Sequence, residues 1–90
     1  MPVYRLKLHR KVEKFIHTLA PERRTSFRNK LEILRQNTYN HPQLDIKPMQ
    51  GMGDSIYRLR LGPYRLIYEI RNQELLIYIM TASSRGDVYK

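Results

Sequence analysis

The chain has 90 residues, which allow one small hydrophobic core and predict a single domain over residues 1–90. Seventeen Lys and Arg against eight Asp and Glu give a net charge of +9, which favours an anionic partner such as nucleic acid, an acidic protein segment or an anionic membrane. The absence of cysteine excludes disulfides, thiol catalysis and cysteine-ligated zinc, and the absence of a long apolar run or signal peptide predicts a cytoplasmic protein.

The N-terminal part predicts a strand followed by two helices. Residues 3–8 alternate between apolar and charged side chains, which predicts a strand at an edge of a sheet or half exposed. Residues 12–19 carry apolar side chains at helical spacing, and Pro21 can open a second helix that runs to about Asn37. Because their connection is so short, we expect an antiparallel helical hairpin whose apolar stripes face the same sheet.

The segment after the helices predicts a loop, a short strand and a turn. Residues 38–45 have loop composition, and residues 46–50 are compatible with a short strand that Pro48 interrupts. Residues 51–54 contain two glycines typical of a turn, and their spacing is too short for a nucleotide-binding loop.

Residues 56–70 predict two antiparallel strands joined by a tight turn. Gly62 can take the positive φ that a type II′ turn requires at its first position, and proline suits the second. With that turn, Arg58, Arg60 and Arg65 share one face, and Arg60 lies directly across from Arg65. Two like charges in this position are unfavourable unless an anion lies between them.

A phosphate is one such anion, because guanidinium groups bind phosphate oxygens through paired hydrogen bonds. The alternative is a solvated sheet face whose long side chains cover apolar surface and extend into water. The hairpin alone does not decide between the two. On the opposite face Tyr57, Tyr64 and Tyr68 are expected to belong to the core.

The last predicted strand spans residues 75–80, and a tight connection would set Arg71 opposite Glu74. The full order is strand, helix, helix and a meander of antiparallel strands. This order predicts an α+β fold in which a helical hairpin packs on one face of a small antiparallel sheet and leaves the other face open.

An RNA contact surface is expected on that open face. The predicted register places Met80 beside Arg65 and Tyr78 beside Ile67, so the arginines adjoin an aromatic and apolar surface where a base could stack. Lys47, Tyr78 and Arg71 are the candidate RNA-binding residues.

Two segments carry a family resemblance. Residues 56–70 read Ile-Tyr-Arg-Leu-Arg-Leu-Gly-Pro-Tyr-Arg-Leu-Ile-Tyr-Glu-Ile, and residues 85–89 read Arg-Gly-Asp-Val-Tyr. With the helical hairpin before them, they resemble the RelE/ParE superfamily of toxin-antitoxin toxins, and within it the RelE branch. The resemblance covers essentially the whole chain. It implies an endoribonuclease that enters the ribosomal A site, cuts the mRNA codon there and is neutralised by a cognate RelB-like antitoxin in a hetero-oligomer, without a membrane partner.

The resemblance also implies an active site. The family's alternating basic pair, second-strand arginine, late arginine and terminal tyrosine match Arg58, Arg60, Arg65, Arg85 and Tyr89. The RNA 2′-hydroxyl attacks the adjacent phosphate while fixed guanidiniums stabilise the developing charge, so neither a metal nor a cofactor is expected. Arg65 and Arg85 would clamp the scissile phosphate. Arg58 and Arg60 would stabilise charge or position the substrate, and Tyr89 would stack on a base or protonate the leaving 5′-oxygen.

One departure from the family pattern keeps other functions open. Relatives carry lysines at the basic pair, whereas arginine effectively stays protonated, so proton abstraction by Arg58 or Arg60 is disfavoured. The chain could instead be a ParE-like toxin that poisons DNA gyrase without cutting RNA. It could also be an inactive relative that still binds its antitoxin.

Overall fold

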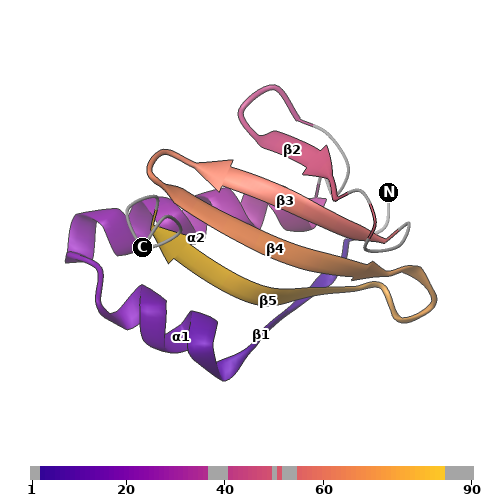
Figure 1. The fold of residues 1–90 in the computed structure, drawn as a ribbon, viewed down its shortest axis with the longest axis horizontal. Helices are drawn as coiled ribbons and strands as arrows, with labels where there is room; N and C mark the ends of the chain where they lie inside the picture. Colours follow the sequence, from indigo (N-terminus) through magenta and orange to yellow (C-terminus); the bar gives the residue numbers. More distant parts are fainter. Residues whose placement is uncertain (1–2, 37–40, 50, 52–54, 85–90) are drawn as a thin grey trace.

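The computed structural model describes residues 3–36, 41–49, 51 and 55–84, which form a five-stranded sheet covered by two helices (Figure 1). The strands are β1 (Arg5–Leu8), β2 (Asp45–Pro48), β3 (Ile56–Leu61), β4 (Tyr64–Arg71) and β5 (Leu76–Ser84). The helices are α1 (Arg10–His17) and α2 (Pro21–Gln36), and a 3-10 turn (Asn72–Glu74) links β4 to β5.

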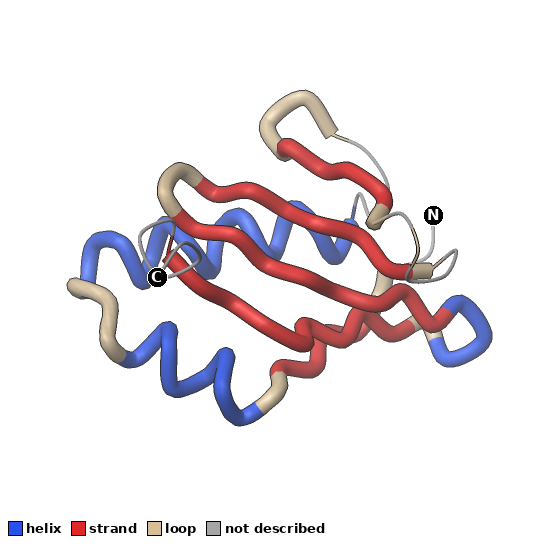
Figure 2. Tube along the Cα trace, in the orientation of Figure 1, coloured by secondary structure: helices blue, strands red, loops and turns tan. Residues whose placement is uncertain are grey.

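The strand order is β1-β5-β4-β3-β2 (Figure 2). Strands β2 to β5 are antiparallel neighbours, as the predicted meander requires. The first strand lies at an edge, as predicted, but it pairs in parallel with β5. Parallel neighbours need a long connection, and here nearly the whole chain lies between the two strands. The α+β fold is confirmed.

The two helices cover one face of the sheet. The chain reverses direction between α1 and α2, and in Figure 1 α2 passes behind the strands. Val12 and Ile16 of α1 are buried, as are Phe27, Leu31 and Leu34 of α2. Each of these side chains contributes about 1.5–3 kcal/mol relative to leaving it exposed. Neither of the two described helices lies on the other face of the sheet, as predicted.

The hairpin of β3 and β4 has the predicted register. Gly62 has a φ of 59°, so it supplies the positive φ that the tight turn needs. Leu61 pairs with Tyr64, and Arg60 pairs with Arg65. Tyr68 is fully buried on the helix side, and the ring of Tyr57 stacks on it with 5.8 Å between centroids.

The predicted register between β4 and β5 is wrong. Arg71 pairs with Leu76 instead of Glu74, because the connection runs from Asn72 through Leu75 and is longer than the predicted tight turn. Leu75 closes it in the left-handed conformation, with a φ of 49°.

A bulge in the same strand pair changes the register again. The irregularity falls between Ile67 and Tyr68, and beyond it Arg65 pairs with Ser83. Tyr78 pairs with Glu69 instead of the predicted Ile67, and the predicted pairing of Met80 with Arg65 is also wrong. Strand β5 also continues to Ser84, past its predicted end.

Candidate functional site

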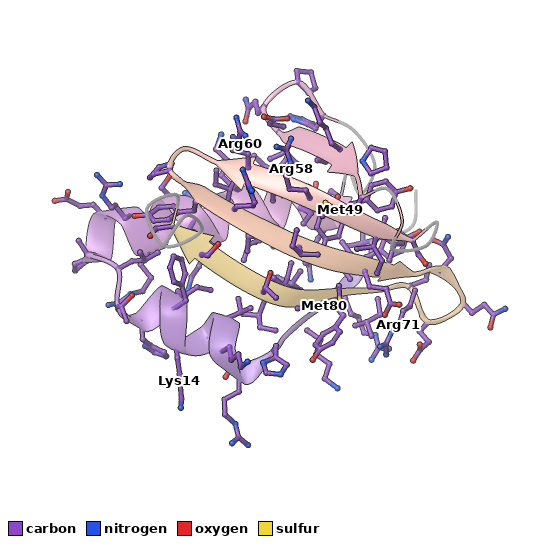
Figure 3. The ribbon with its side chains drawn as sticks, viewed as in Figure 1. Lys14, Met49, Arg58, Arg60, Arg71 and Met80 are labelled. Atoms are coloured by element: carbon purple, nitrogen blue, oxygen red, sulfur yellow. The ribbon has the colours of Figure 1, made fainter. Side chains whose placement is uncertain are left out.

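Three neighbouring arginines lie together on the sheet face that the helices leave uncovered, which we call the open face. Leu59 and Leu66 are fully buried under the helices, and strand alternation therefore turns Arg58, Arg60 and Arg65 to the opposite side. Figure 3 shows Arg58 and Arg60 projecting from β3 on this side. We call these three residues the arginine cluster.

Arg60 and Arg65 face each other directly across the strand pair. Arg60 is exposed and Arg65 is half-buried. Within the described ranges, no ion pair engages either guanidinium. Two like charges directly opposite each other destabilise a sheet, so this pair favours an anion between the two groups.

Arg58 is held by an acidic side chain from the neighbouring strand. Its Nη2 atom donates to Asp45 Oδ1 at 3.1 Å, although Asp45 pairs with Arg60 in the β2–β3 register. The Arg58 side chain is 11% exposed and that of Asp45 is 48% exposed. The buried Nε of Arg58 has no hydrogen-bond acceptor among the described residues. The arginine cluster therefore contains one guanidinium that Asp45 holds in place and whose buried Nε donor is unsatisfied within the described part of the chain.

Asp45 was not identified from the sequence. Its contact with Arg58 depends on how β2 pairs with β3, and residues 50 and 52–54, between those strands, lie outside the described residues. The sequence offers only an acidic residue at the end of the predicted loop, directly before the short strand at residues 46–50.

The three predicted RNA contacts are separated by the structure. Lys47 faces Arg58 across β2 and β3, beside the arginine cluster. Tyr78 and Arg71 lie together elsewhere, with Arg71 Cζ 5.4 Å from the Tyr78 ring centroid. Figure 3 shows Arg71 at the opposite end of the sheet from Arg60.

Arg71 is itself part of an ion pair. Its Nε donates to Glu69 Oε1 at 2.6 Å, and this hydrogen bond and charge raise the pKa of Arg71 above its ordinary value. Arg65 and Arg71 are six positions apart on β4, which corresponds to about 20 Å. Tyr78 pairs with Glu69, four positions or about 13 Å along the strand from Arg65, and so lies farther from the arginine cluster than predicted.

Arg85 and Tyr89 lie outside the described residues. The last described residue of β5, Ser84, pairs with Tyr64 at the start of β4. The described part of β5 therefore ends beside Tyr64, the residue directly before Arg65.

Other features of the described residues lie away from the open face. A groove of about 540 Å³ is lined by β1, α1 and α2, with Leu8, Ile16 and Leu31 among its walls. No group of three His, Cys, Asp or Glu residues that could hold a metal occurs in the described ranges. Neither described helix is long and apolar enough to cross a membrane.

Comparisons with known proteins agree with one another over nearly the whole chain. The model of a family described as the ParE toxin of the type II toxin-antitoxin system, parDE, matches residues 6–89. A Methanocaldococcus jannaschii protein that bears the toxin name RelE1 is 30% identical over 87 residues, or 97% of this chain and 96% of that protein.

Solved structures show the same arrangement. The RelE of an archaeal RelE-RelB complex from Pyrococcus horikoshii OT3 has a TM-score of 0.81 and 32% identity, over 93% of this chain and 97% of that one. The RelBE2 complex from Mycobacterium tuberculosis gives a TM-score of 0.74 at 19% identity, over 92% of this chain and 99% of that one. The latter likeness concerns the fold alone.

Proposed function

The chain belongs to the ParE toxin family within the RelE/ParE superfamily of type II toxin-antitoxin toxins, and we propose that it is a RelE-like endoribonuclease acting on mRNA at the ribosome. One observation carries the proposal beyond the family. Arg60 and Arg65 face each other on the open face, with Arg58 beside them, and none of the described acidic groups forms an ion pair with the facing pair.

The arrangement suits a phosphodiester because it is electrostatically incomplete without an anion. The arginine cluster carries three positive charges against the single carboxylate of Asp45. A backbone phosphate between Arg60 and Arg65 would replace their repulsion with charge-assisted hydrogen bonds. Fixed donors aimed at the charge that develops on phosphate oxygens are a major source of rate enhancement in such reactions.

The proposed reaction is transesterification within the RNA. The 2′-oxygen loses its proton and bonds to the adjacent phosphorus, while the bond from phosphorus to the 5′-oxygen breaks and that oxygen takes up a proton. In this proposal Arg65 and Arg85 clamp the scissile phosphate, and Arg58 and Arg60 stabilise its equatorial oxygens. Because arginine stays protonated, none of these arginines is the base. Tyr89 or a ribosomal group would carry out the two proton transfers, from the 2′-oxygen and to the leaving 5′-oxygen.

We also propose a RelB-like antitoxin as the partner of this toxin. Two of the structural neighbours, from Pyrococcus horikoshii and Methanococcus jannaschii, are RelE proteins in complex with RelB. The net charge of +9 favours an acidic segment in any protein that covers the open face.

A ParE-like function is the second candidate, because the family whose model matches this chain is described as the ParE toxin. Such a toxin would poison DNA gyrase and leave RNA intact. The arginine cluster favours RNA cleavage, since protein binding alone does not require two facing arginines.

Mapping of 5′ ends in cells tests the proposal. The chain is expressed from a tight promoter in growing bacteria, and we expect codon-phased cuts within translated regions together with growth arrest. Arg65→Ala should abolish both. Arg10→Ala removes the same charge from an exposed site on α1 and should preserve both.

Three results would contradict the proposal. Cuts that persist in Arg65→Ala would remove the arginine cluster from the reaction. Equal cutting of untranslated RNA would exclude dependence on the ribosome. DNA breaks without RNA cuts would assign the chain to gyrase poisoning.

A further inference from the structure

A second cationic site lies on the open face at the far end of β4. Tyr78 on β5 is half-buried and stands between Lys7 of β1, its direct cross-strand partner, and Arg71 of β4. Lys7 Nζ is 5.9 Å and Arg71 Cζ is 5.4 Å from the centroid of the tyrosine ring. We call these three residues the Tyr78 site.

The two cations differ in how firmly they are held. Arg71 is tied to Glu69 at 2.6 Å, which fixes its guanidinium close to the ring. Lys7 is exposed, and no ion pair to it is found among the described residues. At nearly 6 Å its attraction to the ring is at the weak limit of such contacts. Lys7 can therefore swing outward at little cost, which would uncover the ring on its side.

We propose that the Tyr78 site binds single-stranded RNA, with one base stacked on Tyr78 in the place that Lys7 vacates. The displaced ammonium would then pair with a neighbouring phosphate, while Arg71 stays in place beside the ring. Aromatic rings flanked by cations bind single strands in this way, because every base has a π-face and every linkage carries a charge. The site holds RNA and takes no part in bond cleavage.

The surface between the two sites fits the same ligand. Ile67 lies on the open face between Arg65 and Arg71 and is half-buried, and Figure 3 shows Met80 on this face between Arg60 and Arg71. A strand of RNA running from the arginine cluster to the Tyr78 site over about 20 Å would cross these apolar side chains and then Glu69, whose carboxylate is paired with Arg71. An acidic protein segment would not need the tyrosine face, so a stacking platform favours RNA.

The inference rests on the proposed function, which supplies RNA as the ligand. Its test is fluorescence anisotropy of the full chain with a labelled 2′-O-methyl RNA of about ten nucleotides, whose blocked 2′-oxygen prevents cleavage. Tyr78→Ala should weaken binding by about 5- to 100-fold. Tyr78→Phe keeps the ring and should remain within about twofold of the parent chain.

A lysine pair provides the matched control. Lys7→Ala should reduce the slope of log affinity against log salt concentration by about 0.7, which is the contribution of one phosphate contact on a single strand. Lys14→Ala removes the same charge from α1, where Figure 3 shows the side chain pointing away from the sheet, and should leave the slope unchanged.

The stacking can also be measured in the parent chain. On titration with the RNA, the ring proton resonances of Tyr78, assigned by their absence in Tyr78→Phe, should move upfield. This measurement holds even if Tyr78→Ala fails to fold. Unmoved resonances, unchanged affinity in Tyr78→Ala, or an equal loss in the alanine and phenylalanine variants would overturn the inference. Tyr78-dependent binding of an acidic peptide but not of RNA would also overturn it.

The outcome is separable from that of the proposed function. Arg65→Ala should lose cleavage and retain the part of RNA binding that depends on Tyr78. If the parent chain cuts no RNA but still binds it through Tyr78, the nuclease proposal fails and the Tyr78 site remains. If cleavage depends on Arg65 while binding ignores Tyr78, the reverse holds.

Discussion

At the scale of single residues, we expect the arginine cluster to lower the stability of the fold and to serve RNA cleavage. Arg60 and Arg65 repel each other in the free protein, because they are direct cross-strand partners with like charge. We predict that Arg60→Gln raises the free energy of unfolding by about 0.2–1 kcal/mol while it lowers cleavage. Denaturant titration of the parent chain and of Arg60→Gln measures the change in the free energy of unfolding. Arg10→Gln, which lowers the net charge equally from an exposed helical site, should change stability less.

Asp45 should restrain RNA binding at the same cluster. Its carboxylate lies 3.1 Å from the Arg58 guanidinium and offsets part of the charge offered to a phosphate. We predict that Asp45→Asn tightens RNA binding by about two- to fivefold at low salt, with the gain fading as salt increases. Stability should fall by less than about 1 kcal/mol, because Asp45 is half exposed. Binding that weakens at low salt would show that the ion pair instead orients Arg58 for RNA.

These residues differ in how far the sequence could place them. Alternation and the turn at Gly62 fix the register within a few residues, so the sequence predicts that Arg60 lies opposite Arg65, as the structure shows. Asp45 could not be connected to Arg58, because that contact depends on strand pairing that no tight turn specifies. The roles of Arg85 and Tyr89 stay predictions.

At the scale of elements, connections decide what the sequence could predict. The turn at Gly62 carries a plain signal, because a glycine followed by a proline matches one turn type. The connection from Asn72 to Leu75 carries none, since leucine rarely adopts the left-handed φ of 49° found at Leu75. As a result of this register, Tyr78 pairs with Glu69 instead of Ile67 and lies two positions farther from Arg65 than predicted.

The turn at Gly62 can be tested directly. An added Cβ would meet nothing within 4 Å, so the cost of substitution comes from the φ of 59° alone. We predict that Gly62→Ala lowers the free energy of unfolding by about 1–2 kcal/mol, and that Gly62→Asn lowers it less because asparagine tolerates this conformation. Thermal unfolding compares the two. A loss in Asn equal to that in Ala would point to contacts of the turn rather than to its backbone.

At the scale of the whole molecule, the net charge of +9 should act with opposite signs on folding and on binding. Self-repulsion destabilises a compact chain of one dominant charge, and salt screens it. The free energy of unfolding should therefore rise as salt increases from low to moderate concentration.

RNA affinity should fall over the same range, because each phosphate contact releases a counterion from the RNA and this release is less favourable at higher salt. Engagement of the three arginines of the cluster predicts a slope of about −2 in log affinity against log salt, and an added contact at Lys7 makes it steeper. Parallel titrations of unfolding and of anisotropy in the same buffers measure both trends. If affinity were insensitive to salt while stability rose, the open face would bind its partner through apolar contacts, and the phosphate-based reading of the arginine cluster would be wrong.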